Sequence, residues 1–492
     1  MGNTGQDVVL VKPGGRVETF GGLSQFSGFA PPLDIGLLAA YLRAKGFSVS
    51  IIDADAEFLT PEETAGRIIE KKPFLVGIFA HTLRMSHASK TLHLLKEAGS
   101  NIRTLLGGRH PSALPERTLK EEQVDFVCQG EPYLPIEKLL SILRKNRQAS
   151  AVEIEGLWFR QNDKVVHNPP APLISELDSL PMIAWDLLPM QRYRAHNWQC
   201  LDNLSIRGPY SILYTSIGCP FGCSYCVVNA VYGRPIIRLR SPERVIEDFN
   251  CLVNSYQVRY LRITDDLFTF KTKRVLDICE RLAAANSGIN IWVYARVDTV
   301  NYEVLKAMKA AGIRWVCYGI ESGQEEVRQG VRKNFDRDKI FRAVEMTYKA
   351  GIHIIANYIF GLPEDNQESM QATLDMAEKL NCEYANFYTA MAWPGSQLYY
   401  EAINRQIRMP ETWQGYSPLA YETLPLPTKH LTASQVLEFR DLAFNHYFSR
   451  KTYQDMLAEK FGQSAVEHVQ RLLQKKIKRK YVEEIKLTQY WQ

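Results

Sequence analysis

Three cysteines are the residues of this chain whose type and spacing indicate chemistry most directly. Cys219, Cys223 and Cys226 lie in the short segment 216–227, with three and then two residues between them. The thiolate is the form of cysteine that binds metals, and three thiolates on a tight loop can hold one face of an iron-sulfur cluster. The loop supplies no fourth ligand, so the spacing predicts a three-thiolate metal site with one position open to a small molecule.

Two other interpretations of these cysteines remain open. A structural zinc site normally has a fourth Cys or His at short spacing, whereas the nearest histidines, His196 and His353, are far away in the sequence. The three residues could also be buried thiols that bind no metal. The motifs that accompany them favour the cluster over both alternatives.

The cysteine motif resembles the signature of the radical S-adenosylmethionine (SAM) superfamily. That signature is Cys-x3-Cys-x2-Cys with an aromatic residue just before the last Cys, and Tyr225 occupies that place here. The resemblance implies a 4Fe-4S cluster on Cys219, Cys223 and Cys226. It also implies that the fourth iron chelates the amino and carboxylate groups of SAM, and that an electron from the cluster cleaves SAM to a 5′-deoxyadenosyl radical.

Length and composition indicate a globular protein of two or three domains. The chain has 492 residues, of which 46% are apolar and 23% charged. A net charge of +5 gives no reason to expect nucleic acid as a partner. Six further cysteines are scattered singly, which fits a reducing cytoplasm. The N-terminal residues do not resemble a signal peptide, and no segment reaches the roughly 18 apolar residues that span a membrane.

Strands and helices alternate through residues 1–145, which we expect to form the N-terminal domain. Short apolar runs indicate strands, and apolar residues at helical spacing indicate helices. The alternation is typical of a doubly wound, Rossmann-like α/β domain, in which ligands bind at the carboxyl ends of parallel strands. The predicted strands are 8–11, 47–53, 75–79, 104–106 and 126–128, and the predicted helices are 34–45, 60–71, 87–98 and 134–145.

The residues after the last three of these strands could approach a large, flat ligand. A glycine pair allows the backbone to come close to such a ligand, although the pair alone is equally typical of a turn. Together with the segments 31–36 and 76–78, these strand ends resemble the cobalamin-binding domain that precedes the cluster domain in one subgroup of the radical SAM superfamily. The resemblance covers residues 7 to about 145. It implies cobalamin contacts from His81, Thr82, Gly107, Gly108, Arg109, His110, Gly130 and Glu131.

The chain departs from many cobalamin proteins after the second strand. Those proteins carry Asp-x-His-x-x-Gly, whose His binds cobalt from below, whereas this chain has Asp53-Ala54-Asp55-Ala56-Glu57-Phe58. Members of the resembled subgroup often lack this His and bind cobalamin without a protein axial ligand, so cobalamin remains expected while its lower ligand stays open. His81 and His110 could contact the cofactor, or they could be structural residues with hydrogen-bond partners.

Three further regions follow the first domain. Residues 146–210 are rich in proline, with a β-hairpin at 156–160 and 165–167, and are expected to be a linker. Residues 211–395 alternate again and predict a partial, TIM-like (β/α)6 barrel. Residues 396–492 are expected to be helical, with helices at 432–447 and 463–474. The predicted barrel strands are 211–217, 259–264, 290–295, 314–320, 354–360 and 384–390, and the helices 242–256, 271–285, 301–311, 336–350 and 367–380.

Polar residues follow four of the barrel strands, where the reactive groups of such barrels lie. A carboxylate can receive the ammonium group of SAM, and an arginine can hold its carboxylate in a fork. Asp265 and Asp266 could instead be a helix N-cap pair. In order behind the cysteine motif, the strand ends resemble the SAM site of the superfamily. The resemblance implies SAM contacts from Tyr225, Asp265, Asp266, Arg296, Glu321, Ser322, Gly361 and Leu362.

The resemblance predicts a cobalamin-dependent radical SAM enzyme, and most relatives with this domain order methylate unactivated carbon. A radical oxidative cyclase, as in anaerobic bacteriochlorophyll synthesis, or a rearrangement enzyme would use the same cofactors. A cobalamin-dependent sensor or binding module is a further alternative. The expected partners are a small-molecule or natural-product substrate and an electron donor such as flavodoxin or ferredoxin. Nearby aromatic residues, Tyr214, Tyr388 and Trp393, are interpreted as core rather than as substrate contacts.

Overall fold

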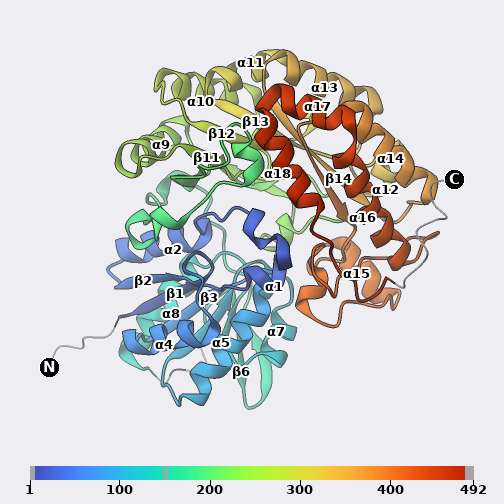
Figure 1. Ribbon diagram of the computed structural model, residues 1–492. Coiled ribbons are helices and arrows are strands. Elements are labelled where there is room, and N and C mark those ends of the chain that lie inside the picture. Colours follow the sequence, from blue (N-terminus) through green and yellow to red (C-terminus); the bar gives the residue numbers. More distant parts are fainter. Residues whose placement is uncertain (1–5, 148, 150–152, 483–492) are drawn as a thin grey trace.

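The protein consists of two α/β units that lie against each other and a C-terminal region packed along the second unit (Figure 1). The computed structural model describes residues 6–147, 149 and 153–482. The first unit is blue to cyan in Figure 1, the second green to orange, and the C-terminal helices red. This arrangement confirms the predicted order of a Rossmann-like domain, a barrel and a helical C-terminal region.

The N-terminal unit is centred on a sheet whose first five strands are parallel and lie in the order β2-β1-β3-β4-β5. Successive residues of a strand point to opposite faces, so Leu10 packs with helices α2 and α8, and Val9 with α4, α5 and α7. Helices on both faces explain the uninterrupted apolar runs of the strands. The strands are β1 (Val8–Lys12), β2 (Val49–Asp53), β3 (Leu75–Phe79), β4 (Arg103–Gly107) and β5 (Phe126–Cys128), and the helices α2 (Leu33–Ala44), α4 (Pro61–Lys71), α5 (Met85–Glu97), α7 (Pro115–Glu121) and α8 (Tyr133–Lys145).

The hairpin expected in the linker belongs to this sheet. Its strands, β6 (Leu157–Gln161) and β7 (Lys164–His167), extend the sheet to seven strands, and β6 pairs antiparallel with β5. Phe159 is buried against the sheet, and the pairing covers the backbone groups that β5 would otherwise leave open at an edge. The sheet therefore continues past residue 145, where the sequence predicts the domain to end.

Short helices after the strands are the main elements that the sequence does not predict. The helices α1 (Arg16–Phe20), α3 (Ala54–Glu57) and α6 (Arg109–Ala113) have five residues or fewer, and α7 has seven. Segments of this length are too short to show helical periodicity. They lie where the site residues are, because three of them directly follow β1, β2 and β4.

The second unit contains the predicted six parallel strands, in the order β15-β14-β13-β12-β11-β8. Five longer helices alternate with them, and this confirms the prediction of a partial (β/α)6 barrel. The strands are β8 (Tyr210–Leu213), β11 (Tyr260–Ile263), β12 (Asn290–Ala295), β13 (Ile313–Glu321), β14 (His353–Phe360) and β15 (Tyr384–Thr389). The helices are α9 (Pro242–Tyr256), α10 (Thr272–Ala284), α11 (Tyr302–Ala310), α13 (Arg337–Lys349) and α14 (Gln367–Leu380).

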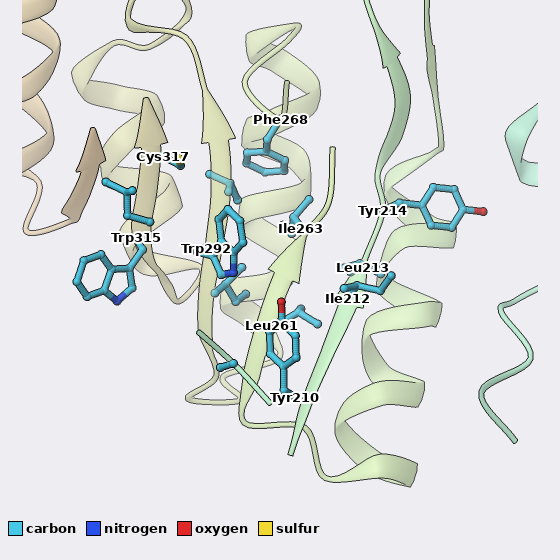
Figure 2. Packing of buried hydrophobic residues seen from close by; sticks show 14 of the residues in the cluster. Tyr210, Ile212, Leu213, Tyr214, Leu261, Ile263, Phe268, Trp292, Trp315 and Cys317 are labelled. Carbon is cyan, nitrogen blue, oxygen red and sulfur yellow. The ribbon is translucent and has the colours of Figure 1, made fainter. Parts of the chain in front are cut away.

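Aromatic side chains fill the lower part of the barrel. Trp292 and Trp315 stand on neighbouring strands (Figure 2), and Trp198 from the linker packs edge-on against both, at 5.0 and 5.7 Å between ring centroids. Phe461 from the C-terminal region stacks on Trp315 at 5.8 Å. The amino-terminal end of the barrel is therefore closed by residues from outside it, and the strand ends at its carboxyl side remain for the site.

The first predicted barrel strand is divided in two. The chain leaves β8 at Leu213 and forms β9 (Ser216–Cys219), which pairs antiparallel with β10 (Ile236–Leu239) as a separate two-stranded ribbon. Gly218 has a positive φ of 88°, and a Cβ at this position would collide with the Ile236 carbonyl. This ribbon carries the cysteine loop between its two strands.

The C-terminal region joins both units. It contains α15 (Gln397–Asn404), the short helix η9 (Trp413–Tyr416), α16 (Ala433–Ser449), α17 (Lys451–Phe461) and α18 (Gln463–Leu473). Of these, only α16 and α18 correspond to individually predicted helices. The α16 helix packs on β15 and α14, while Trp413 contacts His110 of the N-terminal unit, with ring centroids 4.4 Å apart. Within the described ranges of the chain, no helix has the length and apolar content needed to cross a membrane.

Candidate cluster and cofactor site

The cysteine loop is fixed at the carboxyl end of the barrel. Cys219 ends β9, and Cys223 and Cys226 follow on the loop; all three side chains are half-buried. The Ser224 amide donates to the carbonyl of Val331 at 3.2 Å, and the Ser224 carbonyl accepts from the Leu398 amide at 3.0 Å. The barrel and the C-terminal region thus hold the loop from two sides.

The donor set suits a cluster better than a single ion. In the described part of the chain, no three His, Cys, Asp or Glu side chains are arranged to hold one metal ion. A zinc site needs such convergence, whereas each cysteine of a cluster binds a different iron. Burial raises the pKa of Cys226 to about 11, so its thiolate forms when a metal replaces the proton.

Asp265 supports the base of the loop. Its carboxylate is buried and accepts hydrogen bonds from the Thr215 amide at 2.7 Å and the Ser216 hydroxyl at 2.7 Å, just before the first cysteine. Burial raises the pKa of Asp265, although these donors act in the opposite direction. The alternative of an N-cap pair is wrong, because α10 begins only at Thr272.

Asp266 extends toward the N-terminal unit. Its side chain is one quarter exposed, and Asp266 Oδ1 lies 3.8 Å from the guanidinium of Arg109, which follows β4. Two residues predicted to contact different cofactors therefore meet across the two units.

Tyr225, Glu321 and Lys333 form a buried triad beside the loop. The sequence predicts the first two as site residues but not the third. The Tyr225 hydroxyl donates to Glu321 Oε1 at 2.9 Å, and Lys333 forms an ion pair with the same oxygen. Lys333 also donates to the Tyr225 hydroxyl at 3.3 Å. Lys333 is not predicted, since it belongs to no motif and follows the strand end by twelve residues. The triad fixes the Tyr225 ring next to Cys226.

Arg296 lies beneath the other side of the loop. Its guanidinium makes a two-pronged contact with Asp298, at 2.9 and 2.8 Å, and lies 3.8 Å from the ring centroid of Phe221. Phe221 stands between the first two cysteines, so Arg296 is adjacent to the loop.

The remaining predicted SAM residues lie behind the surface of the site. Ser322 is fully buried, and its hydroxyl lies 3.2 Å from that of Thr373. The amides of Gly361 and Leu362 both donate to Asp365 Oδ2 at 3.0 Å. Burial raises the pKa of Asp365 to about 6. These groups shape the strand ends through contacts within the protein.

Two of the predicted cobalamin residues are partners of each other. The Thr82 hydroxyl lies 3.2 Å from His110 Nδ1, and the His110 ring is buried beneath Trp413. These contacts agree with the interpretation of His110 as a structural residue with hydrogen-bond partners.

The glycine pair after β4 is required by close backbone contact. Gly108 has a φ of 97°, and a Cβ there would lie 2.8 Å from the carbonyl oxygen of Ala80, which follows β3. A Cβ on Gly107 would lie 2.7 Å from the Phe79 ring. The two strand ends can approach this closely because both positions lack side chains.

Glu131 joins the N-terminal unit to the ribbon that carries the cysteines. Both of its carboxylate oxygens accept from Arg238 of β10, at 3.1 and 2.5 Å, and both side chains are at most 8% exposed. The Ile174 amide donates to Glu131 at 2.9 Å. Nearby, Gly130 has a φ of 88° and contacts the Val231 carbonyl, also on the ribbon side.

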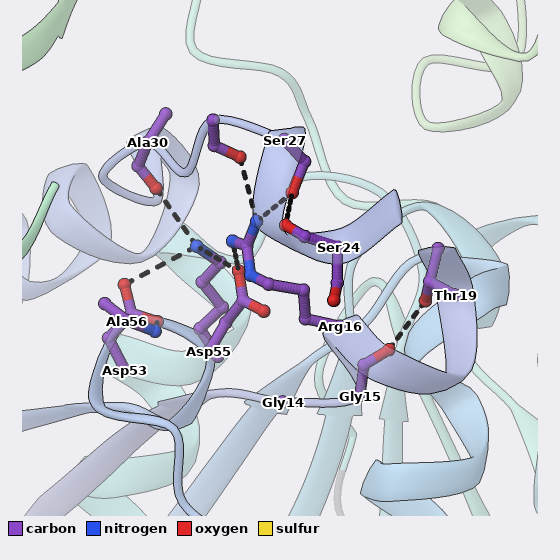
Figure 3. Close-up of polar contacts among 12 residues, drawn as sticks. Gly14, Gly15, Arg16, Thr19, Ser24, Ser27, Ala30, Asp53, Asp55 and Ala56 are labelled. Carbon is purple, nitrogen blue, oxygen red and sulfur yellow. Dashed lines mark hydrogen bonds and ion pairs between the residues drawn. The ribbon is translucent and has the colours of Figure 1, made fainter. Parts of the chain in front are cut away.

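The second strand end is occupied by a buried ion network (Figure 3). Asp55 forms an ion pair with Arg16 at 2.7 Å, and both side chains are labelled in Figure 3. Asp55 also pairs with Arg84 at 3.2 Å, and Lys12 lies 3.5 Å from both Asp53 and Asp55. Burial acts to raise the pKa of Asp55, but these cations outweigh it and lower the pKa to about 2. Ionised carboxylates in ion pairs thus occupy the end of the second strand.

Charged and titratable side chains lie at the strand ends of the N-terminal unit. Asp34, His81 and Arg109 are exposed to solvent, 53% in the case of the Arg109 side chain. Burial nevertheless raises the pKa of Asp34 and lowers that of His81 to about 3. The contact between Arg109 and Asp266 joins the carboxyl ends of both sheets.

The inner face of the barrel is polar at strands β14 and β15. Tyr388 of β15 is 39% exposed, so its interpretation as a core residue is wrong. Asn386 donates to Asn357 at 2.8 Å, and Asn357 donates to the thiol of Cys317 at 3.1 Å. By contrast, Tyr214 points outward and packs under Arg240, in agreement with its expected core position (Figure 2).

The fold and the site together define the class of protein. A partial barrel with three cysteines on the loop after its first strand is the architecture of a radical SAM enzyme. The Rossmann-like domain, whose strand ends contact this barrel end, has the glycine pair that allows the backbone to approach a large flat cofactor.

Comparison with known proteins supports both halves of this assignment. The family model described as B12 binding domain matches residues 22–140, and the model of the Radical SAM superfamily matches residues 213–377. An uncharacterized methyltransferase from Pyrococcus horikoshii is 33% identical over 421 residues, 85% of this chain and 88% of the relative. An anaerobic magnesium-protoporphyrin IX monomethyl ester cyclase from Rubrivivax gelatinosus is 28% identical, over 77% of this chain and 68% of the cyclase.

A solved structure shows the same fold. The radical SAM methyltransferase TsrM from Kitasatospora setae, solved with cobalamin and a 4Fe-4S cluster, matches with a TM-score of 0.69 at 16% identity, over 92% of this chain and 90% of that chain. The chain belongs to the radical SAM superfamily, in the group with an N-terminal B12-binding domain. It is an enzyme whose cofactors are a 4Fe-4S cluster, SAM and cobalamin.

Proposed function

We propose that the enzyme transfers a methyl group from SAM to an unactivated carbon of a small-molecule substrate. The observation that carries this proposal is the contact between the two sets of strand ends, made by Arg109 with Asp266 and by Glu131 with Arg238. When bound, the cofactors supply a radical from one SAM and a methyl group from another. The chain's own contribution is to keep both cofactors facing one substrate.

The residues around the loop divide into two groups under this proposal. Four residues stand next to the loop or at the contact between the two units and would contact SAM: Tyr225, Asp266, Arg296 and Glu321. Behind them, further residues hold the strand ends and the loop in place through contacts within the protein. These are Asp265, Ser322, Gly361 and Leu362.

The substrate would lie against the polar inner face of the barrel. Tyr388 and the half-buried Tyr294 offer ring surface there, and Asn357 and Asn386 offer amide groups. Burial raises the pKa of Tyr294 to about 12, so its hydroxyl remains protonated and can donate a hydrogen bond at neutral pH. A neutral, partly aromatic surface suits a small organic substrate better than a polyanion.

Product analysis with methyl-labelled SAM tests the reaction. Methyl transfer by this route consumes two SAM molecules, so we expect S-adenosylhomocysteine and 5′-deoxyadenosine in equal amounts and the label in the product. A cyclase or a rearrangement enzyme would give 5′-deoxyadenosine without S-adenosylhomocysteine. That result with the true substrate would overturn the proposal, and a binding module would produce neither compound.

A flavodoxin or ferredoxin of the cytoplasm is proposed to reduce the cluster from the outer side of the loop. Gly222 is exposed there and lies close to Pro235 of the ribbon, which follows the exposed Arg234. On the other side, the Cys223 thiol contacts the carbonyl of Arg332, whose side chain is also exposed. These two exposed arginines beside the cysteine loop would attract an acidic electron donor.

Replacing Arg332 by Glu tests this surface. With flavodoxin as the donor, we expect SAM cleavage to slow by about tenfold at low ionic strength, because the substitution opposes the approach of an anionic protein. With dithionite, the rate should be unchanged. Arg314→Glu is the matched control, since Arg314 is exposed at the opposite end of β13. Equal rates for both variants with flavodoxin would contradict the proposed surface.

A further inference from the structure

We propose that Arg262 binds a carboxylate group of the substrate on the inner face of the barrel. This site deepens the proposed function and rests on it, because it names a charge that the small-molecule substrate carries. Arg262 belongs to β11 and precedes the two aspartates that follow this strand. Its guanidinium is distinguished by its place in the barrel and by the partners that it lacks.

Arg262 points to the inner face of the barrel. Its guanidinium carbon lies 4.8 Å from the ring centroid of Trp292 and 5.3 Å from that of Tyr294, both on the neighbouring strand β12. Trp292 packs edge-on against Trp198 in the aromatic layer that closes the amino-terminal end of the barrel. Tyr294 is two residues closer to the carboxyl end. The guanidinium therefore lies between this layer and the strand ends that carry the site.

The inner face at this level is accessible from the carboxyl end. Arg262, Tyr294, Asn357, Asn386 and Tyr388 are half-buried or exposed, whereas the residues directly before and after each of them are buried. Successive residues of a strand point to opposite faces, and the helices of the barrel cover its outer face. The accessible side chains therefore share the inner face, where a small molecule can reach them.

The guanidinium of Arg262 has no hydrogen bond or ion pair within the described part of the chain, and its Nε atom is buried. Arginine carries several N–H donors, and buried donors are normally satisfied. Other covered arginines of the barrel are satisfied by backbone groups: Arg274 donates to the carbonyl of Thr215, and Arg328 to that of Ser322. Arg262 thus keeps its donors for a ligand.

The carboxylates that follow the nearby strands are already bound within the protein. Glu321 pairs with Lys333, Asp298 with Arg296 and Asp266 with Arg109, while Asp265 accepts from Thr215. The chain therefore leaves the charge of Arg262 uncompensated, and a charge that is partly removed from water is costly without a partner. The anion that pairs with it comes from a bound molecule.

A carboxylate suits this position better than a polyanion. The planar guanidinium binds a carboxylate through two parallel hydrogen bonds, and the rings of Trp292 and Tyr294 hold it in place. Arg262 brings a single positive charge to a face whose other accessible side chains are neutral: Tyr294, Asn357, Asn386 and Tyr388. One negative charge on an otherwise neutral substrate is balanced there.

Two matched probes test the site without turnover. Benzoate and benzamide share the same ring, but only benzoate carries a carboxylate. The full-length protein, loaded with cluster, hydroxocobalamin and SAM and kept without a reductant, is titrated with each probe, and saturation-transfer NMR gives the dissociation constants. We expect benzoate to bind about tenfold more tightly, because a hydrogen bond between two charged groups is stronger than one to a neutral amide.

Variants assign this preference to Arg262. In Arg262→Met, benzoate should bind no better than benzamide, whereas Arg262→Lys keeps the charge without the fork and should retain part of the preference. Arg259→Met is the matched control, since Arg259 is exposed directly before the same strand, and it should behave like the parent protein. Equal affinities for the two probes in the parent protein, or an unchanged preference in Arg262→Met, would overturn the proposal.

SAM affinity separates the substrate from SAM, whose own carboxylate is another source of the same group. Equilibrium dialysis of the cluster-loaded protein with labelled SAM should give the same dissociation constant for Arg262→Met and the parent protein. A loss of about tenfold would assign Arg262 to SAM and overturn the substrate site. Because neither measurement needs turnover, product analysis that contradicts methyl transfer would leave the carboxylate site standing.

Discussion

Replacing Cys223 by Ala is expected to abolish the reductive cleavage of SAM. The cluster needs three thiolates, and the chain offers no fourth cysteine near the loop that could substitute for the missing one. After anaerobic reconstitution, the variant should lack the visible absorption of the cluster, and with dithionite and SAM it should form 5′-deoxyadenosine only at background level. Cobalamin binding should remain, because the corrin contacts are expected from the other unit.

Cys251→Ala is the matched control for this experiment. Cys251 is a half-buried cysteine on α9, outside the loop, so its loss changes the thiol count without removing a cluster ligand. This variant should retain both iron content and activity. If the Cys223 and Cys251 variants produced equal amounts of 5′-deoxyadenosine, the assignment of the cluster to the loop would be wrong.

The predictions from sequence succeed where the signal is local. The three cysteines and Tyr225 stand within eight residues, so their spacing alone specifies the loop. The six barrel strands are also correct, because each is a short apolar run between amphipathic helices. Local patterns do not show where two such elements meet in space.

Lys333, Arg238 and Trp413 illustrate what the sequence cannot show. Each reaches the site from a segment without a motif, and each partner, Glu321, Glu131 or His110, lies elsewhere in the chain. The partnership follows from tertiary packing, which no periodicity encodes. A buried charge can nevertheless be recognised as a sign of an unseen partner, because an unpaired one would be costly.

Adjacent residues of the same type can have different roles that the sequence does not distinguish. Asp265 and Asp266 look equivalent in the sequence, but successive side chains leave the end of a strand in different directions. Asp265 turns back toward Thr215 and holds the loop, while Asp266 extends to Arg109 of the N-terminal unit. Which of two carboxylates contacts a ligand is thus decided by direction, and direction is set by the fold.

One of the contacts between the two units is a buried ion pair. Glu131 and Arg238 are both almost inaccessible to solvent, and their pairing fixes the ribbon of the cysteine loop to the end of the N-terminal sheet. Glu131→Ala leaves Arg238 buried without its carboxylate. We expect this to cost about 3–5 kcal/mol of stability, since an uncompensated buried charge is expensive.

A double-variant comparison separates the pair from its individual residues. Urea unfolding of the cofactor-free protein should show a lower first midpoint for Glu131→Ala, whereas Glu131→Met combined with Arg238→Met should recover most of the loss, because no charge remains unpaired. Arg43 and Asp186 form an exposed pair between α2 and the linker, 44% and 58% exposed, and Asp186→Ala should cost at most about 1 kcal/mol. If the double variant were as unstable as Glu131→Ala, the loss would come from packing, and the ion pair would not be what holds the cysteine ribbon against the cobalamin-binding unit.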